Sequence, residues 1–180
     1  MDRLGLPWLI GGSVASSLYG IPRATLDVDL VAKIEPSDVP ELARSWNAHF
    51  LADERMILDA ATMKRSCNLI HLDSALKIDI FVAGSDPWLE QELSNRQILQ
   101  IPGLDTVSSL PFACAEDVLL HKLKWFLDAD RISDRQWNDI VGMVRVRKDS
   151  LDVGHLRRWI RHLSIPEDVL NAALSGWAKP

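Results

Sequence analysis

Three aspartates are the residues of this sequence best suited to chemistry. Asp27 and Asp29 stand two positions apart in a run of aliphatic residues, and Asp79 stands in a second such run. Because successive side chains of a strand point to opposite faces, Asp27 and Asp29 share one face. Neighbouring carboxylates repel each other, and a hard cation such as Mg²⁺ or Mn²⁺ relieves that repulsion by binding their oxygens. If the two strands are neighbours, the sequence predicts a metal site formed by all three aspartates.

A Gly-Gly-Ser turn precedes the first two aspartates. The apolar run 7–10 predicts a short strand, Gly11 and Gly12 end it, and residues 13–19 have helical composition. A helix N-terminus offers backbone N–H groups and a partial positive charge, and glycines permit close approach of a ligand. We therefore expect the turn, with the Ser13 hydroxyl, to bind phosphate. Taken singly, each motif is more typical of an ordinary turn or a solvated strand edge, and the combination favours a site.

The hydrophobic pattern predicts the elements that position these residues. Strands are expected at 26–33, 56–59, 68–72 and 76–82, helices at 39–49 (with Ser37 as its cap) and 87–93, and a loop or edge strand at 98–110. Beyond residue 111 the spacing of apolar residues becomes helical, at 115–127, 133–144, 153–163 and 166–174. The predicted fold is α/β (α+β), with a mixed-sheet core over 1–112 and a helical segment over 113–180 packed on it.

Composition narrows the functional classes. The 180 residues are 47% hydrophobic, enough for one sizeable core, and the net charge of −5 argues against indiscriminate nucleic-acid binding. Cys67 and Cys114 are far apart, and neither has a sequence neighbour that would predict a disulfide or a zinc site. We expect two reduced, half-buried thiols. No leader or membrane-spanning stretch is evident, so a cytoplasmic protein is expected.

The same stretches resemble a known family. Residues 9–13 and 19–30 resemble the glycine turn and double-aspartate signature of the DNA polymerase β-like nucleotidyltransferase superfamily. Residues 77–79 are similar to its third-carboxylate strand. Residues 115–123 and 134–140 are similar to the Lys-Leu helix and the following Asp-rich helix of bacterial proteins grouped with the AbiEii/AbiGii abortive-infection toxins.

The resemblance implies roles for individual residues. Asp27, Asp29 and Asp79 would bind Mg²⁺ or Mn²⁺, and Asp79 would also activate an acceptor hydroxyl. It further implies a nucleotide- and phosphate-binding set, consisting of Gly11, Gly12, Ser13, Arg23, Thr25 and Lys122. The implied reaction transfers a nucleoside monophosphate from a triphosphate such as ATP to a hydroxyl of RNA, a protein or a small molecule. A toxin or phage-defence setting, with a homo-oligomer or a partner-gene protein, would fit the resemblance.

Several alternatives remain open at this point. The chain could be a non-catalytic nucleotide-binding protein, acting as an antitoxin or regulatory partner, or a metal-dependent nuclease that uses the same carboxylates. Lys122 could be a surface lysine whose charged end reaches the solvent. For Asp134 and Asp139, we expect structural roles, such as capping or bracing helices. Basic residues could bind RNA phosphates or simply be solvated, namely Arg145, Arg147, Lys148, Arg157, Arg158, Arg161 and His162.

Overall fold

The computed structural model describes residues 1–101 and 109–176, and these residues divide into two compact units. We call Met1–Gly11 with Thr25–Phe112 the sheet unit, and Gly12–Ala24 with Ala113–Pro180 the helical unit. The division into a core over 1–112 and a helical segment over 113–180 packed on it stays a prediction. Within the described residues, no helix combines the length and the apolar character that a membrane span requires.

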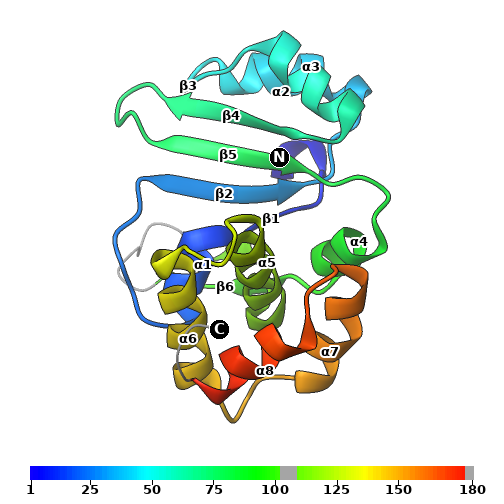
Figure 1. The fold of residues 1–180 in the computed structure, drawn as a ribbon. Coiled ribbons are helices and arrows are strands. Elements are labelled where there is room, and N and C mark those ends of the chain that lie inside the picture. The colour runs from blue at the N-terminus through cyan, green and yellow to red at the C-terminus, as the bar shows by residue number, and fades with distance from the viewer. Residues whose placement is uncertain (102–108, 177–180) are drawn as a thin grey trace. The chain divides into compact units, whose positions relative to one another are not determined.

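The sheet unit is built around seven described strands, and Figure 1 shows their arrangement. Their bounds are β1 Trp8–Ile10, β2 Asp27–Ala32, β3 Phe50–Leu51, β4 Ser66–His71, β5 Lys77–Val82, β6 Gln97–Leu99 and β7 Leu110–Phe112. The order across the sheet is β3-β4-β5-β2-β1-β7-β6. The β2–β5 and β1–β7 pairs are parallel and the other pairs are antiparallel. The predicted mixed sheet with helices is confirmed.

Three described α-helices accompany the sheet in this unit, α2 Val39–Trp46, α3 Glu54–Met63 and α4 Pro87–Ser94, together with 3-10 turns at Asp2–Leu4 and Pro36–Asp38. Leu42 of α2 and Ile57 of α3 join Ala32, Leu69 and Ile80 of the strands in one buried cluster. Burying each large aliphatic side chain contributes about 1.5–3 kcal/mol. Because side chains alternate along a strand, this core uses the face opposite Asp27, Asp29 and Asp79. The other face of β2 and β5 is thus left to the carboxylates.

The prediction of a strand at 56–59 was wrong, because this run lies inside α3. Asp53 is the N-cap residue of α3, and its carboxylate accepts a hydrogen bond from the backbone N–H of Met56 at 3.0 Å. Ile57, Ala60 and Ala61 are buried, which is the spacing of one helix face. A short apolar run is compatible with a strand or a helix. Here the Asp53 cap and the helical spacing of the buried residues favour the helix.

The prediction that Ser37 caps α2 was also wrong. Ser37 lies within the 3-10 turn, and Asp38 occupies the N-cap position of α2. A capping box closes the start of that turn, in which the side chain of Asp38 accepts a hydrogen bond from the backbone N–H of Glu35 at 2.9 Å. The preceding turn therefore sets where α2 begins.

The helical unit contains α1 Gly12–Tyr19, α5 Ala115–Asp128, α6 Asp134–Arg147, α7 Val153–His162 and α8 Glu167–Ser175. Phe126 of α5 packs on Trp137 of α6 with ring centroids 5.0 Å apart. At the end of α1, a Cβ added to Gly20 would lie 2.9 Å from the backbone nitrogen of Met143. The helices predicted after residue 111 are confirmed. Within the region predicted as loop or edge strand, β6 and β7 are described, and residues 102–108 lie outside the described part.

Candidate functional site

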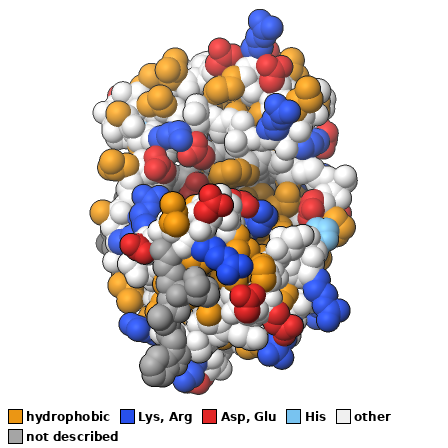
Figure 2. Space-filling view, in the orientation of Figure 1, with side chains coloured by type: hydrophobic (Ala, Val, Ile, Leu, Met, Phe, Trp, Pro, Cys, Tyr) orange, Lys and Arg blue, Asp and Glu red, His pale blue; other side chains and the backbone are white. Residues whose placement is uncertain are grey.

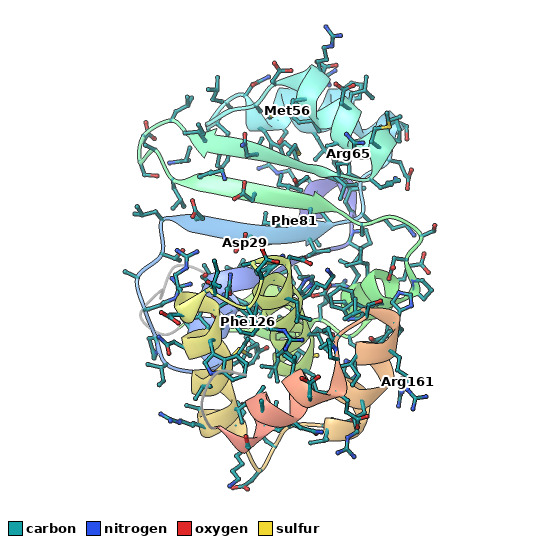
Figure 3. The ribbon with its side chains drawn as sticks, viewed as in Figure 1. Asp29, Met56, Arg65, Phe81, Phe126 and Arg161 are labelled. Carbon is teal, nitrogen blue, oxygen red and sulfur yellow. The ribbon has the colours of Figure 1, made fainter. Side chains whose placement is uncertain are left out.

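Strand pairing brings the three predicted carboxylates together in the sheet unit. In the parallel β2–β5 pair, Asp29 is the register partner of Asp79, and Asp27 is the partner of Lys77. Register partners share a face of the sheet, so the three aspartates lie side by side on it. Figure 3 shows Asp29 on β2 and Phe81 on the neighbouring β5, two residues beyond Asp79. The expectation that the second strand lies beside the first is confirmed.

Backbone contacts fix this end of β2. The N–H of Gly11 donates to the carbonyl of Asp29 at 2.9 Å, which links the glycine turn to the aspartate strand. The Thr25 hydroxyl lies 3.2 Å from the carbonyl oxygen of Asp27 and 3.4 Å from its nitrogen. Thr25 therefore shapes the chain before β2, and its predicted role toward a nucleotide stays a prediction.

Lys77 is a charged neighbour of the aspartates that the sequence interpretation did not use. Its ammonium nitrogen lies 2.8 Å from the carboxylate of Asp79. The hydrogen bond to Asp79 raises the pKa of Lys77, and the charges of Asp27 and Asp29 add to that effect. The sequence could have predicted this contact, because residues two positions apart in a strand, such as Lys77 and Asp79, share a face.

A second group of polar residues lies within the helical unit. Arg23 donates to both oxygens of Asp139, from Nε at 2.9 Å and from Nη2 at 3.0 Å. Lys122 Nζ lies 2.7 Å from Asp139 Oδ2 and 3.4 Å from the Ser13 hydroxyl, which also accepts from Arg23. Three of the residues predicted to bind phosphate are thus neighbours, and we call Ser13, Arg23, Lys122 and Asp139 the cationic cluster.

Because the cationic cluster is largely buried, an unpaired charge in it would destabilise the fold. The side chains of Lys122 and Asp139 are 1% and 6% exposed. Burial alone would raise the pKa of Asp139, but the hydrogen bonds from Arg23 and Lys122 outweigh it and lower that pKa. Arg23 and Lys122 are donors of the kind that binds phosphate oxygens through charge-assisted hydrogen bonds. The interpretation of Lys122 as a surface lysine was wrong.

The turn before α1 depends on glycine. Gly12 has φ of 56°, in the left-handed region that glycine adopts at little cost. It is the first residue of α1, and Ser13 follows it. Backbone N–H groups in the first turn of a helix have no partner within the helix, which suits them to anions. The predicted strand, tight turn and short helix are confirmed as elements, and phosphate binding by the turn stays a prediction.

A buried group of metal-ligating residue types lies elsewhere in the helical unit. Cys114, Asp117 and His155 place one potential ligand atom each within 4.8 Å of one another. The Cys114 thiol donates to Asp117 at 3.0 Å, and His155 Nε2 lies 2.8 Å from the other oxygen of Asp117. The sequence interpretation missed this cluster because His155 comes from α7, far along the chain. These hydrogen bonds brace α5 against α7 without requiring an ion.

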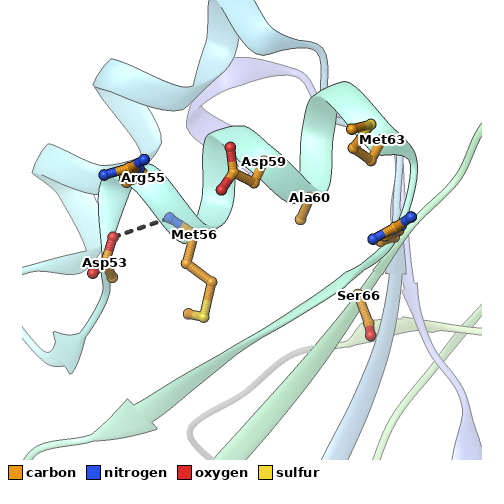
Figure 4. Close-up of a pocket in the computed structure, with 8 residues that line it drawn as sticks. Asp53, Arg55, Met56, Asp59, Ala60, Met63 and Ser66 are labelled. Atoms are coloured by element: carbon orange, nitrogen blue, oxygen red, sulfur yellow. Dashed lines mark hydrogen bonds between the residues drawn. The ribbon is translucent and has the colours of Figure 1, made fainter.

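A cavity of about 350 Å³ lies between α3 and the start of β4 in the sheet unit, and Figure 4 shows its lining. The lining includes Arg55, Asp59 and Met63 of α3 and Ser66 of β4. None of the three aspartates lines it. The cavity is therefore separate from the carboxylates that could bind a metal.

Several solved structures are similar to this chain, including the following two. One is an antigenic nucleotidyltransferase-like protein from Paracoccidioides brasiliensis, with a TM-score of 0.53 and 17% identity over 99% of this chain and 88% of that one. The other is the antibiotic-resistance factor ANT(2'')-Ia, with a TM-score of 0.47 and 14% identity over 97% of this chain and 83% of that one, a likeness too low to support an argument. No protein-family model matches the sequence, and no match was found among curated proteins. The fold of this chain is therefore nucleotidyltransferase-like.

Proposed function

We propose that this protein is a metal-dependent nucleotidyltransferase that transfers a nucleoside monophosphate from a triphosphate to an acceptor hydroxyl. The observation that carries the proposal is the set of three carboxylates on one face of the parallel β2–β5 pair. The nucleotidyltransferase-like fold supports it.

The aspartate face fits a hard divalent cation. Its donor set is made of carboxylate oxygens, which Mg²⁺ and Mn²⁺ prefer over nitrogen or sulfur ligands. Asp27, Asp29 and Asp79 would hold the metal. A bound divalent ion supplies charge neutralisation and orients the reacting oxygens.

The chain's own residues would then position the reactants. Ser13, Arg23 and Lys122 would bind oxygens of the triphosphate through charge-assisted hydrogen bonds. Asp79 would accept the proton of the acceptor hydroxyl while the hydroxyl oxygen forms a bond to the α-phosphorus. The bond from that phosphorus to the bridging oxygen breaks, and pyrophosphate leaves. Positioning and electrostatics supply most of the catalysis in such transfers, because little covalent chemistry is asked of the protein.

We propose a macromolecular acceptor, RNA or protein, on the resemblance to abortive-infection toxins. Basic side chains on α6 and α7 could assist RNA binding, and Arg161 extends from α7 (Figure 3). Figure 2 shows Lys and Arg side chains interspersed with acidic ones on the face in view. Such mixing predicts contacts with individual phosphates rather than broad electrostatic attraction.

The test is transfer of α-phosphate label from each of the four ribonucleoside triphosphates, with Mg²⁺, into cell RNA, cell protein and aminoglycosides. The wild type should label one acceptor class, and Asp27→Asn/Asp29→Asn should lose at least about a thousandfold in rate, as expected for lost transition-state electrostatics. Asp59→Asn, on α3, is the matched control and should label normally. Undiminished transfer by the double variant would refute the site.

The same experiment separates the alternative functions. A non-catalytic nucleotide-binding protein would bind triphosphate and label no acceptor. A nuclease would shorten RNA when no triphosphate is added, and the double variant would stop that cleavage.

A further inference from the structure

Lys77 is the fourth charged residue on the aspartate face. In the parallel β2–β5 pair it is the register partner of Asp27, and it lies two residues before Asp79, the partner of Asp29. Side chains of register partners lie about 5 Å apart, and residues two apart on a strand are separated by about 7 Å. The four residues therefore form the corners of one compact group, with three carboxylates and one ammonium.

The Lys77 ammonium binds a carboxylate that a metal would need as a ligand. Lys77 Nζ lies 2.8 Å from the Asp79 carboxylate, at hydrogen-bond distance. The two side chains are 43% and 23% exposed, so the lysine has room to move into solvent without opening the core. Both a divalent ion and an ammonium group bind carboxylate oxygens, and two cations a few ångströms apart repel each other. Simultaneous occupation is thus unfavourable.

We propose that Lys77 is the resident counter-ion of Asp79 on the aspartate face and leaves Asp79 when a divalent metal binds. This inference rests on the proposed function, because it takes the aspartates as the metal ligands. Lys77 is then a residue that sets metal affinity. The ammonium offsets part of the negative charge of the aspartates at low metal concentration, and the exchange of one cation for another weakens net metal binding.

The test is Mn²⁺ binding to the full chain, followed by the electron paramagnetic resonance signal of the free ion in the absence of nucleotide. Lys77→Met removes the competing charge and keeps most of the length of the side chain. We expect its Kd for Mn²⁺ to fall about tenfold below that of the wild type. The fall is expected because Mn²⁺ no longer has to displace the ammonium from Asp79, and because no second cation repels it there.

Lys33→Met is the matched control in the same unit. Lys33 is 47% exposed, pairs with Glu90 at 3.8 Å and lies four residues beyond Asp29, roughly 13 Å along the strand direction. That separation exceeds the screening length of about 8 Å at physiological salt. Its Kd for Mn²⁺ should stay within twofold of the wild type.

Thermal unfolding gives a second readout that is independent of activity. Without metal, Lys77→Met removes the ion pair of Asp79 on a face that carries two further carboxylates, so its Tm should lie below that of the wild type. Saturating Mn²⁺ should raise the Tm of Lys77→Met by more than it raises that of the wild type.

The outcomes separate this inference from the function on which it rests. If Asp27→Asn/Asp29→Asn abolishes Mn²⁺ binding but Lys77→Met binds no more tightly than the wild type, the counter-ion role is refuted and the metal site stands. If the double variant binds Mn²⁺ normally, or if neither the wild type nor Lys77→Met binds it, the metal site and the counter-ion role both fail.

Discussion

Lys122 Nζ lies 2.7 Å from Asp139 Oδ2, with both side chains almost fully buried. Seventeen residues separate them along the chain, on α5 and α6. Arg23 binds the same carboxylate, so one aspartate holds two cations in place. This shared dependence makes Asp139 the central residue of the cationic cluster for stability.

Asp139→Ala should therefore lower the free energy of unfolding by about 3–5 kcal/mol, because the buried Lys122 ammonium loses its salt bridge to Asp139. Lys122→Met should cost less, because Asp139 keeps Arg23. Urea denaturation measures both. Lys124→Met is the control, since its pair with Asp128 is exposed, and it should change stability by no more than about 0.5 kcal/mol. Equal losses for Asp139→Ala and Lys124→Met would contradict the shared-carboxylate interpretation.

His155 should make stability depend on pH. Its hydrogen bond to Asp117 raises its pKa above the ordinary value of 6.5, although burial acts in the opposite direction. The protonated form is thus favoured in the folded state, so the stabilisation is fully present below about pH 6.5 and is lost as pH rises through the folded pKa. His155→Gln should remove this part of the decline in unfolding free energy as pH rises above about 6.5.

The control for that measurement is His49→Gln, an exposed residue of the sheet unit. It should leave the decline of the wild type intact. A wild-type decline that survives in His155→Gln would show that the pair with Asp117 is not its source.

The two cysteines should be unreactive in the folded protein. Burial raises the pKa of Cys67 to about 11, with a further contribution from Asp79, and burial also raises the pKa of Cys114. Because the thiolate is the reactive form, Ellman's reagent at pH 8 should modify both slowly. Adding urea should expose both thiols and bring their rates to those of free cysteine. Fast modification of either one under native conditions would contradict its burial.

Gly20 and Gly142 form a matched pair for testing helix packing in the helical unit. Gly20→Ala would place a Cβ 2.9 Å from the backbone of Met143, and we expect a loss of about 1–3 kcal/mol. At Gly142 the nearest atom is 3.3 Å away, on the side chain of Ile21, which can move. Gly142→Ala should therefore be neutral or stabilising by up to about 1 kcal/mol, through helix propensity. Urea denaturation that ranks the two variants in the opposite order would refute this packing.

The alternation of residues was sufficient to predict part of the aspartate face. Asp27 and Asp29 share a face in any strand, and the glycines before α1 predict a turn whatever surrounds them, because these are local properties of the backbone. The helices after residue 111 were predictable for the same reason, since their apolar spacing repeats over two or more turns. The run 56–59 was too short to show a helical repeat, and the Asp53 cap before it is what indicates the helix.

Tertiary structure alone decided which distant residues became neighbours. That Asp79 lies opposite Asp29 depends on β5 pairing with β2, and that Asp139 holds both Arg23 and Lys122 depends on helix packing. Sequence spacing does not encode such pairings, because they follow from the balance of all buried surfaces at once. The sequence by itself therefore determined which residues could do chemistry, and the fold determined which of them are charge partners.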